Sequence, residues 1–395
     1  MANSNGFTLK VKESSEGEHF FDFNLFFLVL FMCFIGTIMV YSSSAYFTMY
    51  KLKRNSDGTL QEFFFLKRQL EFVGAGFVVM LIMSFIDYHY LRARTRLVAF
   101  ADIVLIVAYI LQFYVLLKGI SANGASRWLS AGSNRTFQPA EFSKFAIILY
   151  TAMRISTKPL ALDYFSNFVV DQILVLPLTA LIAKENLSSA IIAAGIFFVM
   201  CFANCRKSRY VIAGGAFYAG LAALYVKLKP GYRAGRVAIW RNLEGSGDAG
   251  QQILQGLYAI TSGGIFGTGL GGSVQKYGRV PEAYNDMIFT IICEELGMFG
   301  AIAVIVLYVL VIYRLSFISI NAPDVFGSMF TVGVLAQIAI QALLNILVVT
   351  NSIPSTGVTL PFISYGGSAM LIQLFEIGVV LNISRQINYR RGTVM

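Results

Sequence analysis

The sequence predicts an all-α, polytopic integral membrane protein with about ten transmembrane helices and one long extracytoplasmic loop. Hydrophobic residues make up 56% of the 395 positions, and only 13% are charged. That charged share is about half of what a soluble domain carries. A soluble chain of this length could not bury so much apolar surface in one core, so lipid must solvate most of it. Apolar runs of spanning length also recur along the chain, separated by short polar connections.

A membrane-spanning helix needs about 20 residues, and ten apolar runs approach or exceed that length. They lie at 23–41, 70–86, 98–117, 139–153, 166–183, 187–204, 210–226, 287–313, 325–350 and 357–383. The polar first 22 residues contain no basic leader, so we expect an uncleaved anchor. The predicted layout is a tail at 1–22, seven helices in 23–226, the long loop at 227–286, three helices in 287–384 and a tail at 385–395.

The connecting loops predict the orientation of the chain in the membrane. Dense basic clusters lie at 92–96, at 206–209 and in the tail at 385–391. Short basic loops favour the cytoplasmic side, although the loop at 51–54 is basic as well. We therefore expect both termini in the cytoplasm and the long loop outside. No ATP pool exists outside a bacterial-type membrane, so any reaction there must draw its energy from the substrate itself.

Charge and cysteine usage exclude two other classes of function. The net charge is +10, but the basic residues sit in short pieces between apolar runs, a pattern typical of loops near anionic headgroups and not of nucleic-acid binding. The four cysteines, which lie within or at the ends of apolar runs, and the two histidines show no metal-ligand spacing. We interpret the cysteines as small apolar residues of membrane helices.

The long loop contains Gly-Thr-Gly-Leu-Gly-Gly at 267–272, which formally matches a dinucleotide-binding fingerprint. That motif needs a preceding strand, a following helix and an acid about 20 residues on, and none is evident. Two interpretations stay open. The segment is a turn-rich stretch over the membrane, or its backbone N–H groups cradle a phosphate.

Asp286 is the most informative acid. Pro281 suits the first turn of a helix, so we expect the eighth span to begin there and Asp286 to lie at the mouth of the membrane. Partial desolvation would make this carboxylate a suitable general base. A simple N-terminal acid favoured by the helix dipole fits equally well. Glu282 could share its helix face, as a paired-carboxylate hydrolase would require.

Further acids and amides lie inside the predicted spans. Glu294 and Glu295 would stand roughly 12–14 Å beyond Asp286, too far for a glycosidase pair, so we interpret them as helix-packing or substrate-positioning groups. Such intramembrane polar groups usually face the interior of a bundle or a wet cavity. They include Glu141 and Lys144 three residues apart, Gln337, Gln341 and Asn345 four residues apart along one helix, and Asp171, Lys184 and Glu376.

Several stretches together resemble the SEDS proteins, the FtsW, RodA and SpoVE group of bacterial cell-wall polymerases. In chain order they are Met39–Ser44, Asn123–Leu129, Gln138–Lys144, Ser262–Gly267, Pro281–Asp286, Glu294–Gly297 and Pro354–Ser368. Each is modest alone, but their order and spread over nearly the whole chain are specific.

The resemblance implies a peptidoglycan glycosyltransferase that polymerises lipid II, with Asp286 as the catalytic aspartate. Positive charge for the departing pyrophosphate would come from Arg127, Lys144, Arg233, Arg236 or Lys276, or from a divalent cation such as Mg²⁺ or Mn²⁺. Glu141, Ser364 and Tyr365 join these as expected substrate-binding residues. A class B penicillin-binding protein would supply the transpeptidase, beside other membrane proteins of the divisome or elongasome.

The chain departs from the family pattern at Tyr284, where many members carry histidine, and at Asn186, where an acid is common. We assign no functional role to Asn186. Met39–Ser42 looks more like the division and sporulation members than the elongation-type RodA, which stays an alternative. A lipid II flippase would also explain the intramembrane polar groups, and a structural scaffold of the division machinery is a third hypothesis.

Overall fold

The computed structural model describes residues 21–50, 63–93, 99–122, 125–131, 134–158, 165–205, 208–228, 231–243, 245, 247–277, 280 and 283–387. Its elements are α1 (Phe23–Tyr50), α2 (Phe64–Phe85), the 3₁₀ helix η1 (Tyr88–Arg92), α3 (Phe100–Lys118), β1 (Ile120–Ala122), β2 (Ala125–Ala131), β3 (Asn134–Phe137), α4 (Pro139–Thr157), α5 (Phe165–Glu185), α6 (Leu187–Asn204), α7 (Ser208–Leu228), α8 (Gly231–Arg241), α9 (Gly247–Ser262), α10 (Ile288–Asn321), α11 (Val325–Val349) and α12 (Gly367–Arg385).

A helix lies at each of the ten predicted spans. Seven of them, α1, α2, α3, α6, α10, α11 and α12, are long and apolar enough to cross a membrane within the part of the chain that the structure describes. Their outward faces expose large apolar side chains, among them Phe27, Ile110 and Val309, because lipid and not water is their solvent. The predicted all-α, polytopic membrane fold is therefore confirmed.

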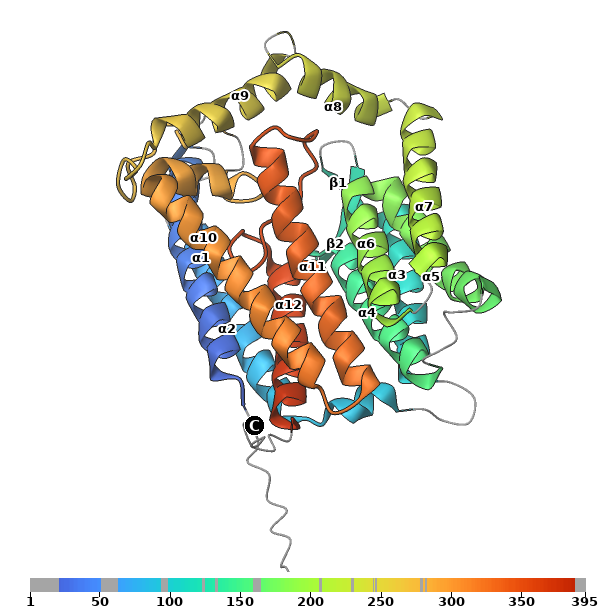
Figure 1. The fold of residues 1–395 in the computed structure, drawn as a ribbon. Coiled ribbons are helices and arrows are strands. Elements are labelled where there is room, and N and C mark those ends of the chain that lie inside the picture. Colours follow the sequence, from blue (N-terminus) through green and yellow to red (C-terminus); the bar gives the residue numbers. More distant parts are fainter. Residues whose placement is uncertain are drawn as a thin grey trace, which may run out of the picture.

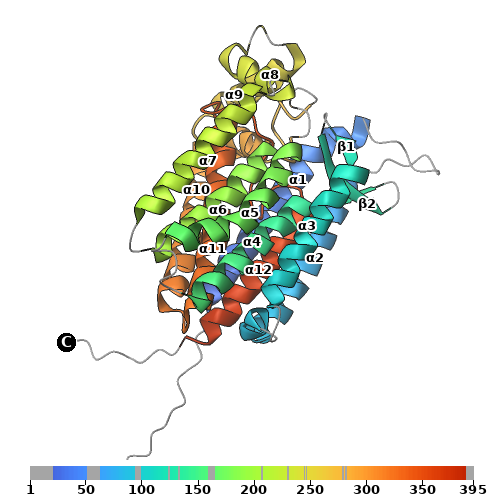
Figure 2. The same ribbon diagram turned by 90° about the vertical axis from the view of Figure 1, so that its right-hand side faces the viewer.

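α12 is the central helix of the bundle (Figures 1 and 2). In an apolar stretch of 18 residues of α12, 78% is buried inside the protein, against 22% in the matching stretch of α2, which packs along α12. Gly378 allows this close approach, because a Cβ there would lie 2.6 Å from the carbonyl oxygen of Met80. α4, α10 and α11 also contact α12, so polar groups on these helices face one another and not lipid.

The bundle has two distinct ends. At the apical end, α8 and α9 form an arch above the other helices (Figure 1). At the opposite, basal end, Asp22 before α1 makes an ion pair with Arg314 of α10 at 2.6 Å, and its backbone N–H contacts Ser384 of α12. The start of the first span and the end of the last span therefore lie at the same end of the bundle, as an even number of spans requires.

The last predicted span begins too early. Residues 350–366 form an irregular segment, and α12 starts only at Gly367. Pro354 and Pro361 interrupt helical hydrogen bonding, and Phe362 has a φ of 62°. Protein buries the apolar side chains of Val358, Leu360, Phe362 and Ile363, and burial in protein is where irregular backbone is tolerated at membrane depth. Its Pro361 carbonyl accepts a hydrogen bond from the Tyr308 hydroxyl of α10.

Two features of the apical end were not predicted. The long loop at 227–286 contains α8 and α9, whose few apolar side chains escape a search for continuous apolar runs. The connection between α3 and α4 forms a three-stranded antiparallel sheet of order β1-β2-β3, in which Ile120 pairs with Trp128. α1 also continues to Tyr50, well beyond the predicted end at residue 41.

Candidate functional site

Asp286 lies at the apical end, in a series of turns at residues 283–287 that leads into α10. α10 begins at Ile288, with Met287 as its N-cap, so the expected helix start at Pro281 is wrong. Pro281 and Glu282 lie outside the described residues. Because residues 283–287 are not helical, the helix face that we expected Glu282 and Asp286 to share does not exist. Asp286 is half-buried, as expected for an acid at the mouth of the bundle.

The backbone of this turn is tied to two other parts of the fold. The Asn345 side chain of α11 donates hydrogen bonds to the carbonyl oxygens of Asp286, at 2.8 Å, and of Val358, at 2.7 Å. The Tyr365 N–H donates to the carbonyl oxygen of Tyr284 at 3.0 Å. α11 and the segment before α12 therefore hold the aspartate from its carbonyl side.

An aromatic cluster packs beside the turn. The buried Tyr284 ring lies 4.3 Å from Phe65 of α2, 5.7 Å from Phe47 of α1 and 5.8 Å from Tyr365, measured between ring centroids. Tyr284 thus fills by packing the position where many family members carry histidine. Burial raises the pKa of the Tyr365 hydroxyl, and a hydrogen bond from Arg68 opposes that rise. Arg68 was missed from sequence because it lies just before the apolar run at 70–86, where a basic residue is ordinary, although α2 already begins at Phe64.

Ser364 and Arg236 lie in or beside the segment that precedes α12. The Ser364 hydroxyl is buried and accepts a hydrogen bond from the Leu360 N–H at 2.8 Å, so it shapes the segment locally. Arg236 of α8 donates to the carbonyl oxygen of Ser355 at 2.9 Å, and Trp240 donates to that of Asn351 at 2.8 Å. α8 therefore contacts the segment before α12. The Val358 carbonyl of this segment, like that of Asp286, accepts a hydrogen bond from Asn345.

Glu141 and Lys144 form an ion pair of 2.8 Å in the first two turns of α4. Lys144 is 0% exposed, and Glu376 of α12 lies within electrostatic range of both. Gln337 of α11 donates to the Glu376 carboxylate at 2.9 Å. A charged and polar cluster thus fills the interior among α4, α11 and α12.

The polar stripe along α11 faces the bundle interior, as predicted. Gln337, Gln341 and Asn345 are all buried. Gln341 accepts a hydrogen bond from Gln373 of α12, which adds a second polar link between these two helices.

The glycine-rich segment at 267–272 is not a phosphate cradle. The N–H groups of Thr268 and Gly269 donate instead to the carbonyl oxygens of Glu294 and Glu295, at 2.9 and 3.0 Å. Those carbonyls are free because α10 kinks at Gly297, which has a φ of 67°. A Cβ on Gly267 would lie 2.2 Å from the Glu295 carbonyl oxygen. The glycines therefore allow close packing against α10.

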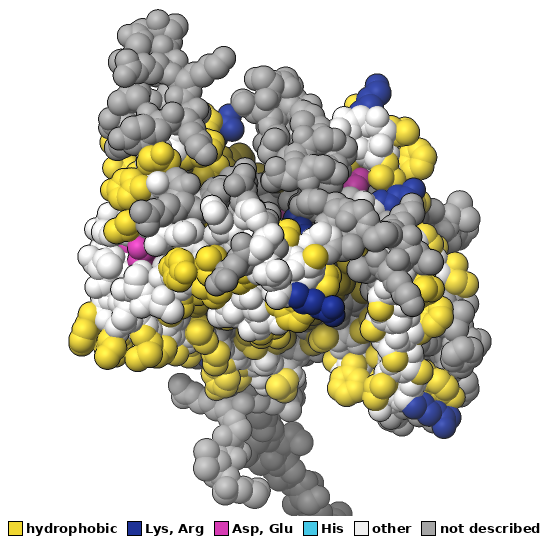
Figure 3. All heavy atoms as spheres, turned by 90° about the horizontal axis from the view of Figure 1, so that it is seen from above, with side chains coloured by type: hydrophobic (Ala, Val, Ile, Leu, Met, Phe, Trp, Pro, Cys, Tyr) yellow, Lys and Arg dark blue, Asp and Glu magenta, His cyan; other side chains and the backbone are white. Residues whose placement is uncertain are grey.

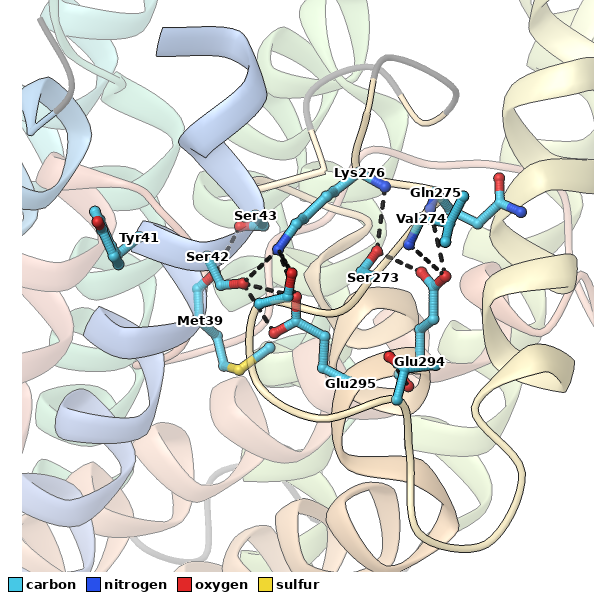
Figure 4. Close-up of polar contacts among 12 residues, drawn as sticks. Met39, Tyr41, Ser42, Ser43, Ser273, Val274, Gln275, Lys276, Glu294 and Glu295 are labelled. Atoms are coloured by element: carbon cyan, nitrogen blue, oxygen red, sulfur yellow. Dashed lines mark hydrogen bonds and ion pairs between the residues drawn. The ribbon is translucent and has the colours of Figure 1, made fainter. Parts of the chain in front are cut away.

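Lys276 lies in a buried network (Figure 4) and also donates to the Gly271 carbonyl oxygen of this segment. Its ammonium contacts the Glu295 carboxylate at 2.9 Å, and the Ser42 hydroxyl of α1 donates to the same carboxylate at 2.7 Å. Glu294 accepts from the Ser273 hydroxyl and from the Val274 N–H. Glu295 thus links α10 to Ser42 of α1, which fits the helix-packing role expected for it, and Glu294 holds a loop, a role that was not predicted.

The backbones of Arg127 and Arg233 lie in β2 and α8, but their side chains, like that of Asp171, lie outside the described part of the structure. Seen from the apical end, the described lysine and arginine side chains are scattered singly among hydrophobic ones (Figure 3). The described basic residues on this face form no common patch, so we judge each one by the contacts that its side chain makes.

Comparisons with known proteins agree along nearly the whole chain. A family model described as "Cell cycle protein", which covers FtsW, RodA and SpoVE, matches residues 23–389. The chain is 36% identical to stage V sporulation protein E of Bacillus subtilis, over 93% of this chain and 98% of that protein. It is also 36% identical to a probable peptidoglycan glycosyltransferase FtsW of Trichlorobacter lovleyi, over 92% of this chain and 93% of that protein.

Solved structures share the fold. One chain of a peptidoglycan synthase complex superposes with a TM-score of 0.75 at 24% identity, over 94% of this chain and 99% of that one. RodA of Thermus thermophilus has a TM-score of 0.66 at 22% identity, over 93% and 98%. The match over residues 23–389 and the 36% identity to full-length relatives show that this chain belongs to the FtsW, RodA and SpoVE family of cell cycle proteins.

Proposed function

We propose that this protein is a peptidoglycan glycosyltransferase that polymerises lipid II, with Asp286 as the general base. The observation that carries the proposal is the half-buried carboxylate at the apical end, in a turn tied to α11 and to the segment before α12. A base held in place in this way needs little reorganisation when the substrate arrives. The relatives named as probable peptidoglycan glycosyltransferases support the same activity.

The reaction needs one base and no covalent enzyme intermediate. Asp286 takes the proton of the acceptor sugar's 4-hydroxyl, and that oxygen attacks the anomeric carbon of the donor MurNAc. The new carbon–oxygen bond forms as the bond to pyrophosphate breaks, and the pyrophosphate leaves with the electron pair. Displacement of an α-linked leaving group inverts the carbon and gives a β-1,4 linkage. Because lipid II carries its own leaving group, no nucleotide is required.

The departing pyrophosphate needs positive charge nearby. Arg236 and the newly found Arg68 are linked by their contacts to the segment beside Asp286, and Lys144 supplies a cation inside the bundle. Among the described residues, no group of three or more His, Cys, Asp or Glu side chains could hold a metal ion. A divalent cation would therefore take most of its ligands from the pyrophosphate and water, as Mg²⁺ commonly does.

The setting of the reaction follows from the predicted orientation. We place the apical end on the outer face of the cytoplasmic membrane and both termini in the cytoplasm. The basic residues Arg92, Arg314 and Arg385 at the basal end support this orientation. A class B penicillin-binding protein would crosslink the glycan, in keeping with the synthase complex whose chain shares this fold. We favour septal synthesis over elongation, since the two sequence relatives described above are a sporulation protein and an FtsW protein.

Polymerisation by the purified protein with its transpeptidase partner tests the proposal. Asp286→Asn is nearly isosteric and removes only basicity, so we expect glycan formation from lipid II to fall at least about 10²-fold while the melting temperature holds. Asp87→Asn changes an exposed acid at the basal end and should leave the rate unchanged. Wild-type rates from a folded Asp286→Asn protein would refute the proposal. Lipid II movement across vesicles without glycan formation would favour the flippase.

A further inference from the structure

Two adjacent glutamates of α10 hold the loop that precedes Asp286 (Figure 4). Glu295 is 0% exposed and binds Lys276 and Ser42. Glu294 is 1% exposed and accepts from Ser273, Val274 and Gln275. Residues 273–276 are therefore tied through two buried carboxylates to one turn of α10, and through Ser42 to α1.

The ammonium of Lys276 has no donor left for a substrate. A lysine carries three N–H donors, and the Lys276 Nζ lies within hydrogen-bond distance of three acceptors. These are the Glu295 carboxylate at 2.9 Å, the Ser42 hydroxyl at 3.1 Å and the Gly271 carbonyl oxygen at 2.8 Å. This arrangement disfavours the role of pyrophosphate ligand that the sequence suggested for Lys276.

The same loop is bound to the kink of α10 through its backbone. Thr268 and Gly269 donate to the carbonyls of Glu294 and Glu295, and the Met298 N–H donates to that of Gly264. α10 begins two residues after Asp286, and the glutamates lie roughly 9–11 Å along it from Ile288. On the other side, the Val280 N–H donates to the Gln275 carbonyl. The anchored loop and the anchored helix thus flank the aspartate in sequence.

We infer that Lys276 and Glu295 are positioning residues for Asp286: their buried ion pair, completed by Ser42, locks the 267–276 loop and the start of α10 into one geometry. The inference rests on the proposed function for its catalytic consequence. A displacement of about 1 Å in a catalytic group can cost about 10²-fold in rate. Breaking the pair should therefore lower kcat and leave KM nearly unchanged, because no substrate contact is lost.

The decisive variants are Lys276→Gln, Glu295→Gln and the two together. Each single change leaves one buried charge without its partner. The double variant keeps two amides that can hydrogen-bond to each other and to Ser42. We expect kcat to fall about 10²-fold in each single variant and to recover to within about tenfold of wild type in the double. Ser42→Ala, which keeps both charges, serves if a single variant does not fold, and should lower kcat several-fold.

Lys118→Gln is the matched control, since Lys118 is an exposed lysine at the apical end of α3 and should change nothing. A second readout is independent of activity. Hydrogen exchange of a peptide covering 283–293 should be faster in the single variants and restored in the double. Hydrogen exchange needs no substrate, so it tests the role of the ion pair independently of activity. A wild type that makes no glycan, or an Asp286→Asn variant that stays active, would refute the proposed function and not this inference.

Two results would overturn the inference. A folded double variant that stays inactive would mean that the charge of Lys276 itself is required, as for a pyrophosphate ligand. The single variants could instead have a lower melting temperature but keep wild-type kcat and wild-type hydrogen exchange at temperatures where they are folded. That result would mean that the pair only stabilises the fold.

Discussion

At the scale of single residues, the two buried lysines of the apical half differ in their hydrogen bonding. Lys276 has three acceptors around its ammonium. Lys144 has its ion pair with Glu141, but among the described residues its Nζ has no partner in hydrogen-bond geometry. A buried ammonium with unused donors can bind an anion, whereas a saturated one cannot. Lys144 is therefore the better candidate for a pyrophosphate ligand.

The Glu141–Lys144 pair yields a prediction that separates the two roles. Lys144→Met leaves Glu141 buried without a counter-ion and should cost about 3–5 kcal/mol in stability. Glu141→Leu combined with Lys144→Met removes both charges and should recover the melting temperature. We expect the double variant to stay inactive in glycan polymerisation, since the ligand is gone.

Thermal unfolding and polymerisation, measured on the same preparations, check this pair. Full activity of the double variant would rule out the ligand role and leave Lys144 as a structural counter-ion of Glu141. Lys158→Met, a change to a lysine just beyond the far end of α4, controls for the loss of positive charge.

At the scale of elements, α11 links the interior of the bundle to the turn at 283–287 that carries Asp286. Its buried amides contact Glu376 and Gln373 of α12 near the middle, and Asp286 and Val358 at the apical end. Hydrophobicity alone cannot orient such a helix about its axis. The polar stripe does so, because each amide must find a partner inside the protein.

Asn345→Leu tests this link. The change keeps the branched four-atom skeleton of the side chain but removes the donor to the Asp286 and Val358 carbonyls, so we expect about 1–3 kcal/mol of destabilisation. The turn would also be released, and we expect kcat to fall at least about tenfold. Gln341→Leu removes a comparable buried amide that bonds only within the interior. It should lose similar stability but keep its turnover per folded molecule, and equal turnover in both variants would argue against the tether.

At the scale of the whole molecule, the two ends of the bundle differ in chemistry. The basal end gathers ion pairs among Asp22, Arg314, Arg92 and Asp324. The apical end carries the arch of α8 and α9, the sheet and the turn with Asp286 (Figure 1). The proposed reaction requires the apical end to face outward, where lipid II polymerisation takes place.

Cysteine labelling checks this orientation. Cys205 is half-exposed and the other three cysteines are buried. The Cys205→Ser variant therefore has no exposed native cysteine to react with the label. In intact cells a cysteine at Gly247, near the start of α9, should react with a membrane-impermeant maleimide. A cysteine at Met395 should react only after the cells are lysed. The reverse pattern would overturn the proposed orientation and, with it, the chemistry on lipid II.

The amino-acid sequence alone was enough to predict the membrane class, the presence of ten of the helices and the inward-facing polar stripe on α11. Each of these depends on local composition or spacing. Long apolar runs indicate lipid exposure, and polar groups inside such a run are costly unless they face the interior of the bundle. The residues of the Glu141–Lys144 pair could be predicted as partners because they lie three positions apart on one helix.

Which groups meet across the chain became clear from the three-dimensional fold alone. Residues 357–366 looked like the start of the last helix because hydropathy cannot distinguish burial in protein from burial in lipid. α8 and α9 were missed because amphipathic surface helices lack long apolar runs. The pairing of Lys276 with Glu295 and Ser42 joins residues 19 and 234 positions apart. Such contacts arise when the helices pack, and that packing gives the Lys276 ammonium three acceptors but, among the described residues, leaves the Lys144 ammonium with unused donors.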